Sequence, residues 1–69
     1  MSTIRKDFSK ILQQKMKEKN ISQVELARAI DVSDTTVYRY MRGLAIPRPL
    51  LMTRIIKVLN CSQDDFYDF

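Results

Sequence analysis

The chain of 69 residues has no histidine and only one cysteine, Cys61. An intramolecular disulfide needs two cysteines, and a zinc site of the Cys/His type needs several such ligands, so both are excluded. Histidine is the side chain that ordinarily titrates near neutral pH, and one thiol without a partner base is a poor nucleophile. We therefore expect no enzyme activity and no cofactor, and we expect Cys61 to be a small buried hydrophobic residue.

Glycine, proline and long apolar runs are also scarce. One glycine and two prolines stand against a hydrophobic content of 45%, a balance typical of a packed helical protein rather than a disordered one. No apolar run approaches the roughly 18 residues of a membrane-spanning helix, and the opening MSTIRKDFSK lacks the apolar centre of a signal peptide. We expect a single cytoplasmic domain over residues 1–69, with no membrane partner and no small-molecule ligand.

Charge is divided unevenly along the chain. Residues 1–57 contain all twelve lysines and arginines but only five acids, a net charge of +7, whereas residues 58–69 carry a net charge of −3 from Asp64, Asp65 and Asp68. Positive charge of this size indicates a polyanionic partner for the first part of the chain. Ordinary surface solubility accounts for it equally well, so the charge supports a motif but does not replace one.

Apolar residues at steps of three and four predict a first helix over residues 4–19, which Asn20 ends. The members of this stripe are Ile4, Phe8, Ile11, Leu12 and Met16. Ser22 lies three residues before Glu25, which is the spacing of a capping box, in which two side chains bind free amides at the start of a helix. A second helix is therefore predicted from Gln23 to about Ile30.

The third helix is marked by signals at both of its ends. Ser33 can cap its start, Asp34 favours the positive end of its dipole, and Gly43 can end it in a left-handed conformation. After a loop, Pro49 suits the first turn of a fourth helix, and Asn60 is a plausible left-handed stop for it. Ser62 and Asp65 repeat the cap spacing and predict a short fifth helix, so the expected fold class is all-α with five helices.

Residues 22–42, SQVELARAIDVSDTTVYRYMR, have the pattern of two short helices joined by a tight turn. In such a unit the helices cross at roughly 90 to 120°, so the apolar side chains must point inward and a small residue is needed where the backbones meet. The small residue is Ala27, and the inward positions are Leu26, Ile30, Val32, Val37 and Tyr40.

This pattern resembles the helix-turn-helix of the lambda repressor and Cro family, the XRE-type domain of bacterial and phage regulators. The resemblance runs from Phe8 to Phe66 and rests on the SQxELA opening, Gly43, Pro47 and the closing VLNCSQDDF. It implies a five-helix lambda-repressor-like domain that binds specific sequences of double-stranded DNA, as in a phage- or mobile-element-type repressor. It also implies a homodimer on a two-fold-related operator, with half-sites about 34 Å apart.

If the third helix enters the major groove, its exposed N-terminal face would read bases. These candidate base readers are Asp34, Thr35, Thr36, Tyr38 and Arg39. Arg39 can pair with guanine through two hydrogen bonds, and Asp34 can accept one from cytosine N4. The resemblance further implies that Gln23, Arg42 and Arg48 hold the DNA backbone, because a helix N-terminus and arginine side chains both suit phosphate oxygens.

The chain departs from the family at two places. Asp31 stands where the turn usually has glycine, and aspartate tolerates a left-handed conformation better than most residues. Met16 and Met41 stand where many relatives have an arginine and a glutamate that face each other. A buried ion pair is often replaceable by apolar residues without loss of stability, so the expected fold is unchanged.

The acidic end of the chain leaves alternatives open. Phe66, Tyr67 and Phe69 are candidates for a dimer contact, with packing in the core as the equal alternative. The competing function is a protein-interaction module of antitoxin or adaptor type, which would use this acidic, aromatic end to bind a partner protein.

Overall fold

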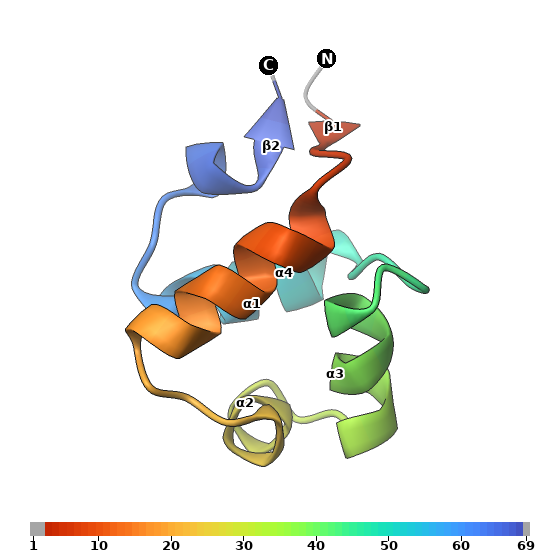
Figure 1. The fold of residues 1–69 in the computed structure, drawn as a ribbon, viewed down its shortest axis with the longest axis vertical. Helices are drawn as coiled ribbons and strands as arrows, with labels where there is room; N and C mark the ends of the chain where they lie inside the picture. The colour runs from red at the N-terminus through yellow and green to blue at the C-terminus, as the bar shows by residue number, and fades with distance from the viewer. Residues whose placement is uncertain (1–2, 69) are drawn as a thin grey trace.

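The computed structural model describes residues 3–68 and contains four α-helices. Figure 1 shows α1 (Phe8–Glu18) crossing in front of α4 (Pro49–Leu59), with α2 (Gln23–Ala29) and α3 (Asp34–Met41) below them. A single 3-10 turn, η1 (Gln63–Asp65), follows α4. Two short strands, β1 (Thr3–Ile4) and β2 (Tyr67–Asp68), pair antiparallel at the pole opposite α2.

The predicted helix boundaries at α2 and α3 are confirmed by their caps. The Ser22 side chain accepts a hydrogen bond from the Glu25 amide at 3.1 Å, and the Glu25 carboxylate accepts one from the Ser22 amide. Ser33 Oγ accepts from the Thr36 amide at 3.3 Å. These contacts satisfy amides that have no partner inside the helix, which is why the helices begin where they do.

Left-handed residues follow all four described α-helices, and the one after α1 is Asn20, with a φ of 55°. Asn60 has a φ of 50° after α4 and Gly43 a φ of 73° after α3. Asp31, in the turn between α2 and α3, has a φ of 62° where the family usually has glycine. A Cβ atom on Gly43 would lie 3.4 Å from Ser9 Oγ on α1, so glycine at this position also permits α1 and the end of α3 to approach closely.

The predictions for the first and the last helix were wrong in part. The first helix begins at Phe8 rather than residue 4, because Ile4 instead pairs with Tyr67 in the small sheet. The Arg5 amide continues this pairing by donating to the Phe66 carbonyl oxygen at 2.8 Å. The fifth helix is only a three-residue 3-10 turn, because the chain turns into β2 directly after it, so the described fold has four α-helices and not five.

One apolar core joins all four helices. Its buried members are Phe8, Leu12, Met16, Leu26, Ala27, Ile30, Val37, Tyr40, Met52, Ile55, Leu59 and Phe66. Four of the five apolar positions predicted to point inward in residues 22–42 are buried, and Val32 is half-buried against the same core. Cys61 is also half-buried at its edge, and burial raises the pKa of its thiol. Within residues 3–68 no helix is long and apolar enough to cross a membrane.

Candidate nucleic-acid interface

The two helices of the motif are tied together at their N-terminal ends. Gln23, the first residue of α2, donates a hydrogen bond from Nε2 to the Asp34 carbonyl oxygen at 3.2 Å. Asp34 is the first residue of α3, so this bond holds the start of one helix against the start of the next. The Gln23 side chain is half-buried, and the bond fixes its position beside the surface that α3 presents.

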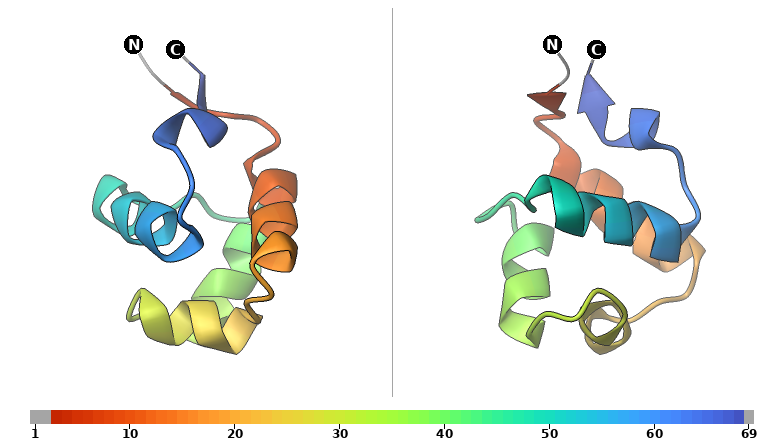
Figure 2. Two further views of the ribbon diagram at one scale, coloured as in Figure 1. Left: turned by 90° about the vertical axis from the view of Figure 1, so that its left-hand side faces the viewer. Right: turned by 180° about the vertical axis from the view of Figure 1, so that it is seen from behind.

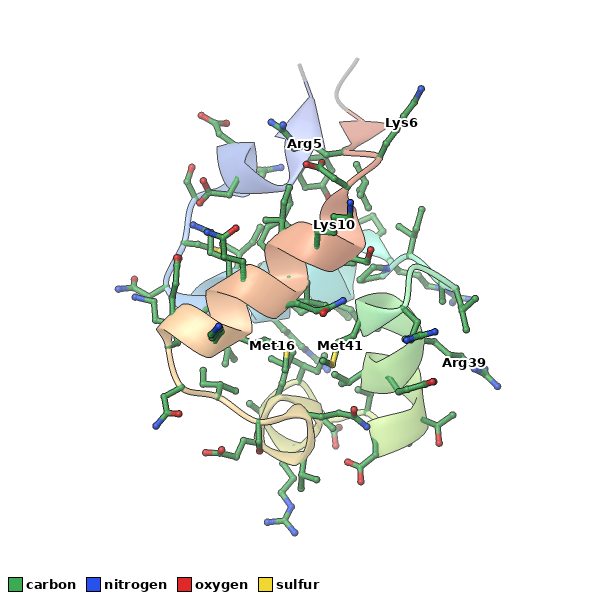
Figure 3. The ribbon with its side chains drawn as sticks, in the orientation of Figure 1. Arg5, Lys6, Lys10, Met16, Arg39 and Met41 are labelled. Atoms are coloured by element: carbon green, nitrogen blue, oxygen red, sulfur yellow. The ribbon has the colours of Figure 1, made fainter. Side chains whose placement is uncertain are left out.

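The outward face of α3 carries most of the predicted base readers. Asp34, Thr35, Tyr38 and Arg39 are all exposed, while Val37 and Tyr40 are buried on the opposite side of the helix. Figure 3 shows the Arg39 side chain extending away from the body of the protein. The structure therefore places these four side chains together on a single accessible surface.

Thr36 differs from the other predicted base readers. Its side chain is half-buried, and its hydroxyl lies 3.0 Å from Ser33 Oγ, within the cap of α3. That hydroxyl is already engaged in a hydrogen bond, so the Thr36 methyl group is the part better suited to a contact with a base. The sequence analysis named Thr36 as a base reader without separating its hydroxyl from its methyl group.

Tyr38 and Arg42 lie one helical turn apart at the C-terminal half of the same face. The Arg42 guanidinium carbon is 5.9 Å from the centre of the Tyr38 ring, within the range of a cation–π contact. Tyr38 is 46% exposed and Arg42 is exposed as well, so both groups remain accessible. The Tyr38 ring thus supports the Arg42 side chain, which is predicted to bind phosphate.

Positive charge borders this face on the side of the loop that leads to α4. Arg48 is the N-cap residue of α4 and is exposed. Burial raises the pKa of Tyr40 on α3, and the positive charge of Arg48 partly opposes this shift. Among the described residues, no acid pairs with Arg39, Arg42 or Arg48. These three charges are therefore free to meet an anionic partner.

A helix-turn-helix family model, HTH_3, matches residues 12–66 of the chain. The chain belongs to this family. The family is that of the XRE-type, lambda-repressor-like helix-turn-helix proteins, and this confirms the resemblance found in the sequence. No match was found among curated proteins.

Solved structures of two repressors resemble this helix-turn-helix domain. The SOS-response transcriptional repressor LexA from Eubacterium rectale is 29% identical, with a TM-score of 0.78 over 84% of this chain and 62% of that one. The DNA-binding domain of the P22 C2 repressor is 23% identical, with a TM-score of 0.79 over 83% of this chain and 75% of that one. The chain thus spans less than two thirds of the LexA structure, and the P22 likeness is one of fold.

Two contacts that sequence reasoning missed hold the helix-turn-helix in place. Arg54 on α4 donates from Nη1 to the Ile30 carbonyl oxygen at 3.1 Å and so closes the C-terminal end of α2. Gln13 on α1 donates from Nε2 to the Met41 carbonyl oxygen at the end of α3. In the sequence, Arg54 stands among the apolar residues of the fourth helix, and this position was the signal that could have pointed to it. Its partner Ile30 lies 24 residues away, so the sequence does not identify the contact.

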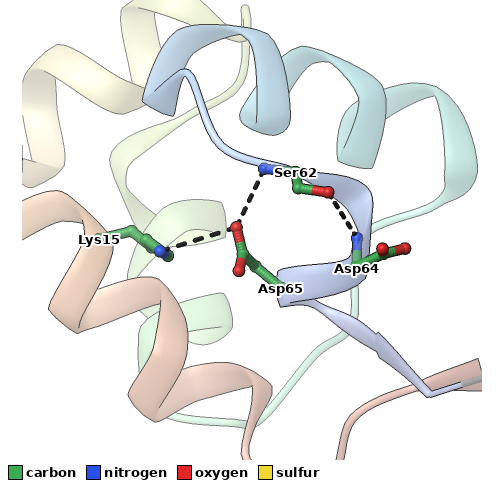
Figure 4. Close-up of polar contacts among 4 residues, drawn as sticks. All are labelled: Lys15, Ser62, Asp64 and Asp65. Carbon is green, nitrogen blue, oxygen red and sulfur yellow. Dashed lines mark hydrogen bonds and ion pairs between the residues drawn. The ribbon is translucent and has the colours of Figure 1, made fainter.

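The acidic C-terminal segment of this helix-turn-helix domain is partly internal. Asp65 accepts from the Ser62 amide at 3.0 Å and lies 3.7 Å from Lys15 Nζ on α1, as Figure 4 shows. Phe66 is fully buried, with its ring centre 5.4 Å from that of Phe8. Phe66 therefore packs in the core, which the sequence analysis gave as the alternative to a dimer contact. Tyr67 is half-buried, and Phe69 lies outside the described residues.

Proposed function

We propose that this protein is a sequence-specific transcriptional regulator, a repressor of phage or mobile-element type that acts in the cytoplasm. In this proposal α3 lies in the major groove of double-stranded DNA, and two copies bind a two-fold-related operator. The observation that carries it is the exposed polar face of α3 together with Arg39, Arg42 and Arg48, which no described acid neutralises. A polyanion with hydrogen-bonding groups in a groove fits such a surface.

Each residue on the face has a proposed partner in the groove. Arg39 would pair with guanine O6 and N7 through two of its guanidinium nitrogens. Asp34 would accept from cytosine N4, and Thr35 would offer its hydroxyl or its methyl group to a base edge. Thr36 would contribute its methyl group to thymine, since its hydroxyl is held by Ser33. Tyr38 would contact bases at the groove edge while supporting Arg42.

The backbone contacts would come from both sides of α3. Gln23 is the first residue of α2, and the amides there that Ser22 does not cap would donate to a phosphate. Arg42 and Arg48 would hold the other strand, because a guanidinium matches two phosphate oxygens. Phosphate contacts of this kind set the register of the protein on DNA but do not read its sequence.

A pair of arginine variants tests this division of roles. A binding site is first selected from a random pool of duplexes, and affinities are then measured for that site and for its single-base variants at several salt concentrations. Arg39→Ala should cost about 1 to 3 kcal/mol on the best site and relax the preference at one base pair. Arg48→Ala should weaken all sequences about equally and lower the salt slope by about one.

Arg28→Ala provides the matched control, because Arg28 is exposed on α2 and no described ion pair or side-chain hydrogen bond involves it. It should leave both the sequence preference and the affinity nearly unchanged. Equal, unselective losses for Arg39→Ala and Arg48→Ala would contradict base reading by α3. Selection of no preferred site by the unaltered protein would contradict the proposed function altogether.

A further inference from the structure

The turn that joins α2 to α3 contains a residue other than glycine in the left-handed conformation. Asp31 has a φ of 62°, which costs free energy in a residue that has a Cβ atom. Its amide donates to the Arg28 carbonyl oxygen at 3.3 Å, and the Val32 amide donates to the Ala27 carbonyl oxygen at 2.9 Å. These two bonds close the C-terminal end of α2, but neither of them uses the carbonyl oxygen of Ile30.

Arg54 on α4 binds that remaining carbonyl group. Its Nη1 atom donates to the Ile30 oxygen at 3.1 Å, and the bond is partly buried. The right-hand view in Figure 2 shows α4 in front, above α2 and the turn. A hydrogen bond from a charged donor is stronger than one between neutral groups, and a positive charge is favourable at the C-terminal end of a helix. Arg54 therefore joins the residue just before Asp31 to a helix outside the helix-turn-helix.

The other side-chain hydrogen bonds of the helix-turn-helix lie at different helix ends. Gln23 joins the start of α2 to the start of α3 through the Asp34 carbonyl oxygen. Gln13 on α1 holds the end of α3 through the Met41 carbonyl oxygen. Within residues 3–68, the bond from Arg54 is the one described side-chain hydrogen bond that joins the C-terminal end of α2 to another element. The direction in which the chain enters α3 thus depends on it.

We propose that Arg54 is a positioning residue for base reading, because it holds the turn at Asp31 in the conformation that sets the first turn of α3 against DNA. The base readers in that turn include Asp34 and Thr35, which begin α3. Arg39 lies farther along the helix, towards the end that α1 holds. Loss of the Arg54 bond should therefore weaken the reading of bases by the first two residues more than the reading by Arg39. The inference rests on the proposed function, since it gives Arg54 a part in DNA recognition.

Duplexes with single-base changes test this role in Arg54→Met, which has a side chain of similar length that cannot donate. Asp34→Ala and Thr35→Ala first identify the base pairs that these residues read. At those pairs Arg54→Met should lower the preference by about threefold to tenfold, the size of one hydrogen bond. The preference at the pair read by Arg39 and the salt dependence should not change. Lys57→Met is the matched control, because it removes a positive charge from an exposed position of the same helix and should alter no preference.

A second substitution separates positioning from a general loss of stability. Glycine adopts the left-handed conformation without the cost of a Cβ atom, so Asp31→Gly should let the turn keep its shape without the Arg54 bond. The double variant Asp31→Gly, Arg54→Met should therefore regain the lost preference, and Arg54→Lys, which keeps a charged donor, should retain it. A salt slope reduced by about one in Arg54→Met would show instead that Arg54 binds a phosphate. Unchanged preference in Arg54→Met, or no recovery in the double variant, would also overturn the positioning role.

Hydrogen exchange without DNA distinguishes a failure of this inference from a failure of the proposed function. The amides of Asp31 and Val32 should exchange about threefold to tenfold faster in Arg54→Met, while the amides of α1 keep their rates. In the double variant with Asp31→Gly, the Val32 amide should be slow again. Equal acceleration in all helices, or none at the turn, would overturn the inference even if the unaltered protein selects a DNA site. Selection of no site would overturn the proposed function and the part of Arg54 in base reading, and the exchange rates would still show whether Arg54 holds the turn.

Discussion

Tyr40 lies at the back of α3, with its ring in the core and the charge of Arg48 nearby. Burial disfavours the phenolate and raises the pKa of Tyr40, and the cation opposes this only in part. The folded protein therefore keeps this proton to a higher pH than the unfolded chain does. Above the tyrosine pKa of the unfolded chain, about 10, unfolding releases a proton, so stability falls as pH rises.

We predict that Tyr40→Phe reduces the loss of stability at alkaline pH, because phenylalanine has no proton to release. The free energy of unfolding, measured with urea near neutral pH and near pH 11, should fall less steeply in this variant than in the unaltered protein. Cys61 also has a raised pKa and is present in both proteins, so its effect cancels. Tyr38→Phe, on the exposed face, is the control. An unchanged pH dependence in Tyr40→Phe would show that this hydroxyl is not desolvated by the fold.

The docking of α1 on α3 depends on contacts at the C-terminal end of α3. Gln13 binds the Met41 carbonyl oxygen, Ser9 lies against Gly43, and Met16 is buried below them. Figure 3 shows the Met16 and Met41 side chains in the space between α1, α2 and α3. The family resemblance implies an ion pair at these two positions, so we expect the two helices to meet through this pair of side chains.

A double-mutant cycle tests that docking. Met41→Glu alone should destabilise the protein, though by less than the ~3 to 5 kcal/mol of a fully buried unpaired charge, because Met41 is only half-buried. Adding Met16→Arg should recover much of the loss by supplying a partner for the carboxylate. Denaturant melts of both single variants and the double variant should give a coupling above the ~0.5 kcal/mol scatter of independent sites. Additive losses would mean that the two positions do not interact.

The elements that sequence predicted best are those with local signals. Ser22 and Glu25 are three residues apart and form a cap at the start of a helix. Asp31, Gly43 and Asn60 adopt left-handed φ angles at the ends of helices, so these residues affect only the chain next to them. The exposed face of α3 followed from helical periodicity in the same way. These features need no knowledge of distant residues.

The features that sequence missed depend on partners far along the chain. Ile4 continues the apolar stripe of α1, yet it pairs with Tyr67 because the two ends of the chain meet. Arg54 binds a carbonyl group that packing of α4 on α2 brings near. The engagement of the Thr36 hydroxyl is local, but Thr36 was assigned to DNA from its helical face alone. The contacts of Ile4 and Arg54 therefore depend on three-dimensional packing and not on the local sequence.

At the scale of the whole molecule, the core is closed by the contact of Phe8 with Phe66. The rings pack at 52° to each other, and the Arg5 amide binds the Phe66 carbonyl oxygen beside them. A domain of this size buries only ~60% of the surface of its unfolded chain. A single fully buried aromatic residue is then a large part of its stability.

We predict that Phe66→Ala lowers the melting temperature strongly and leaves self-association unchanged in the folded protein. Removal of a buried phenylalanine costs about 3 to 5 kcal/mol, against a total of about 5 to 15 kcal/mol for a typical domain. Phe66→Leu should give a smaller shift in the same direction and keeps the protein folded for sedimentation. Tyr67→Ala, at a half-buried position, should melt closer to the unaltered protein. Weaker association of Phe66→Leu at unchanged melting temperature would place Phe66 at a dimer contact instead.

The antiparallel pairing of Thr3 with Asp68 has a practical consequence for protein engineering. The strands β1 and β2, which carry these two residues, lie at one pole, on the opposite side from α2 and near neither end of α3 (Figure 1). A fluorescent protein or an affinity tag attached at either end would project away from the helix-turn-helix. A short peptide linker would also join the ends into a circular backbone, and such closure limits the conformations of the unfolded chain while the native contacts stay as they are.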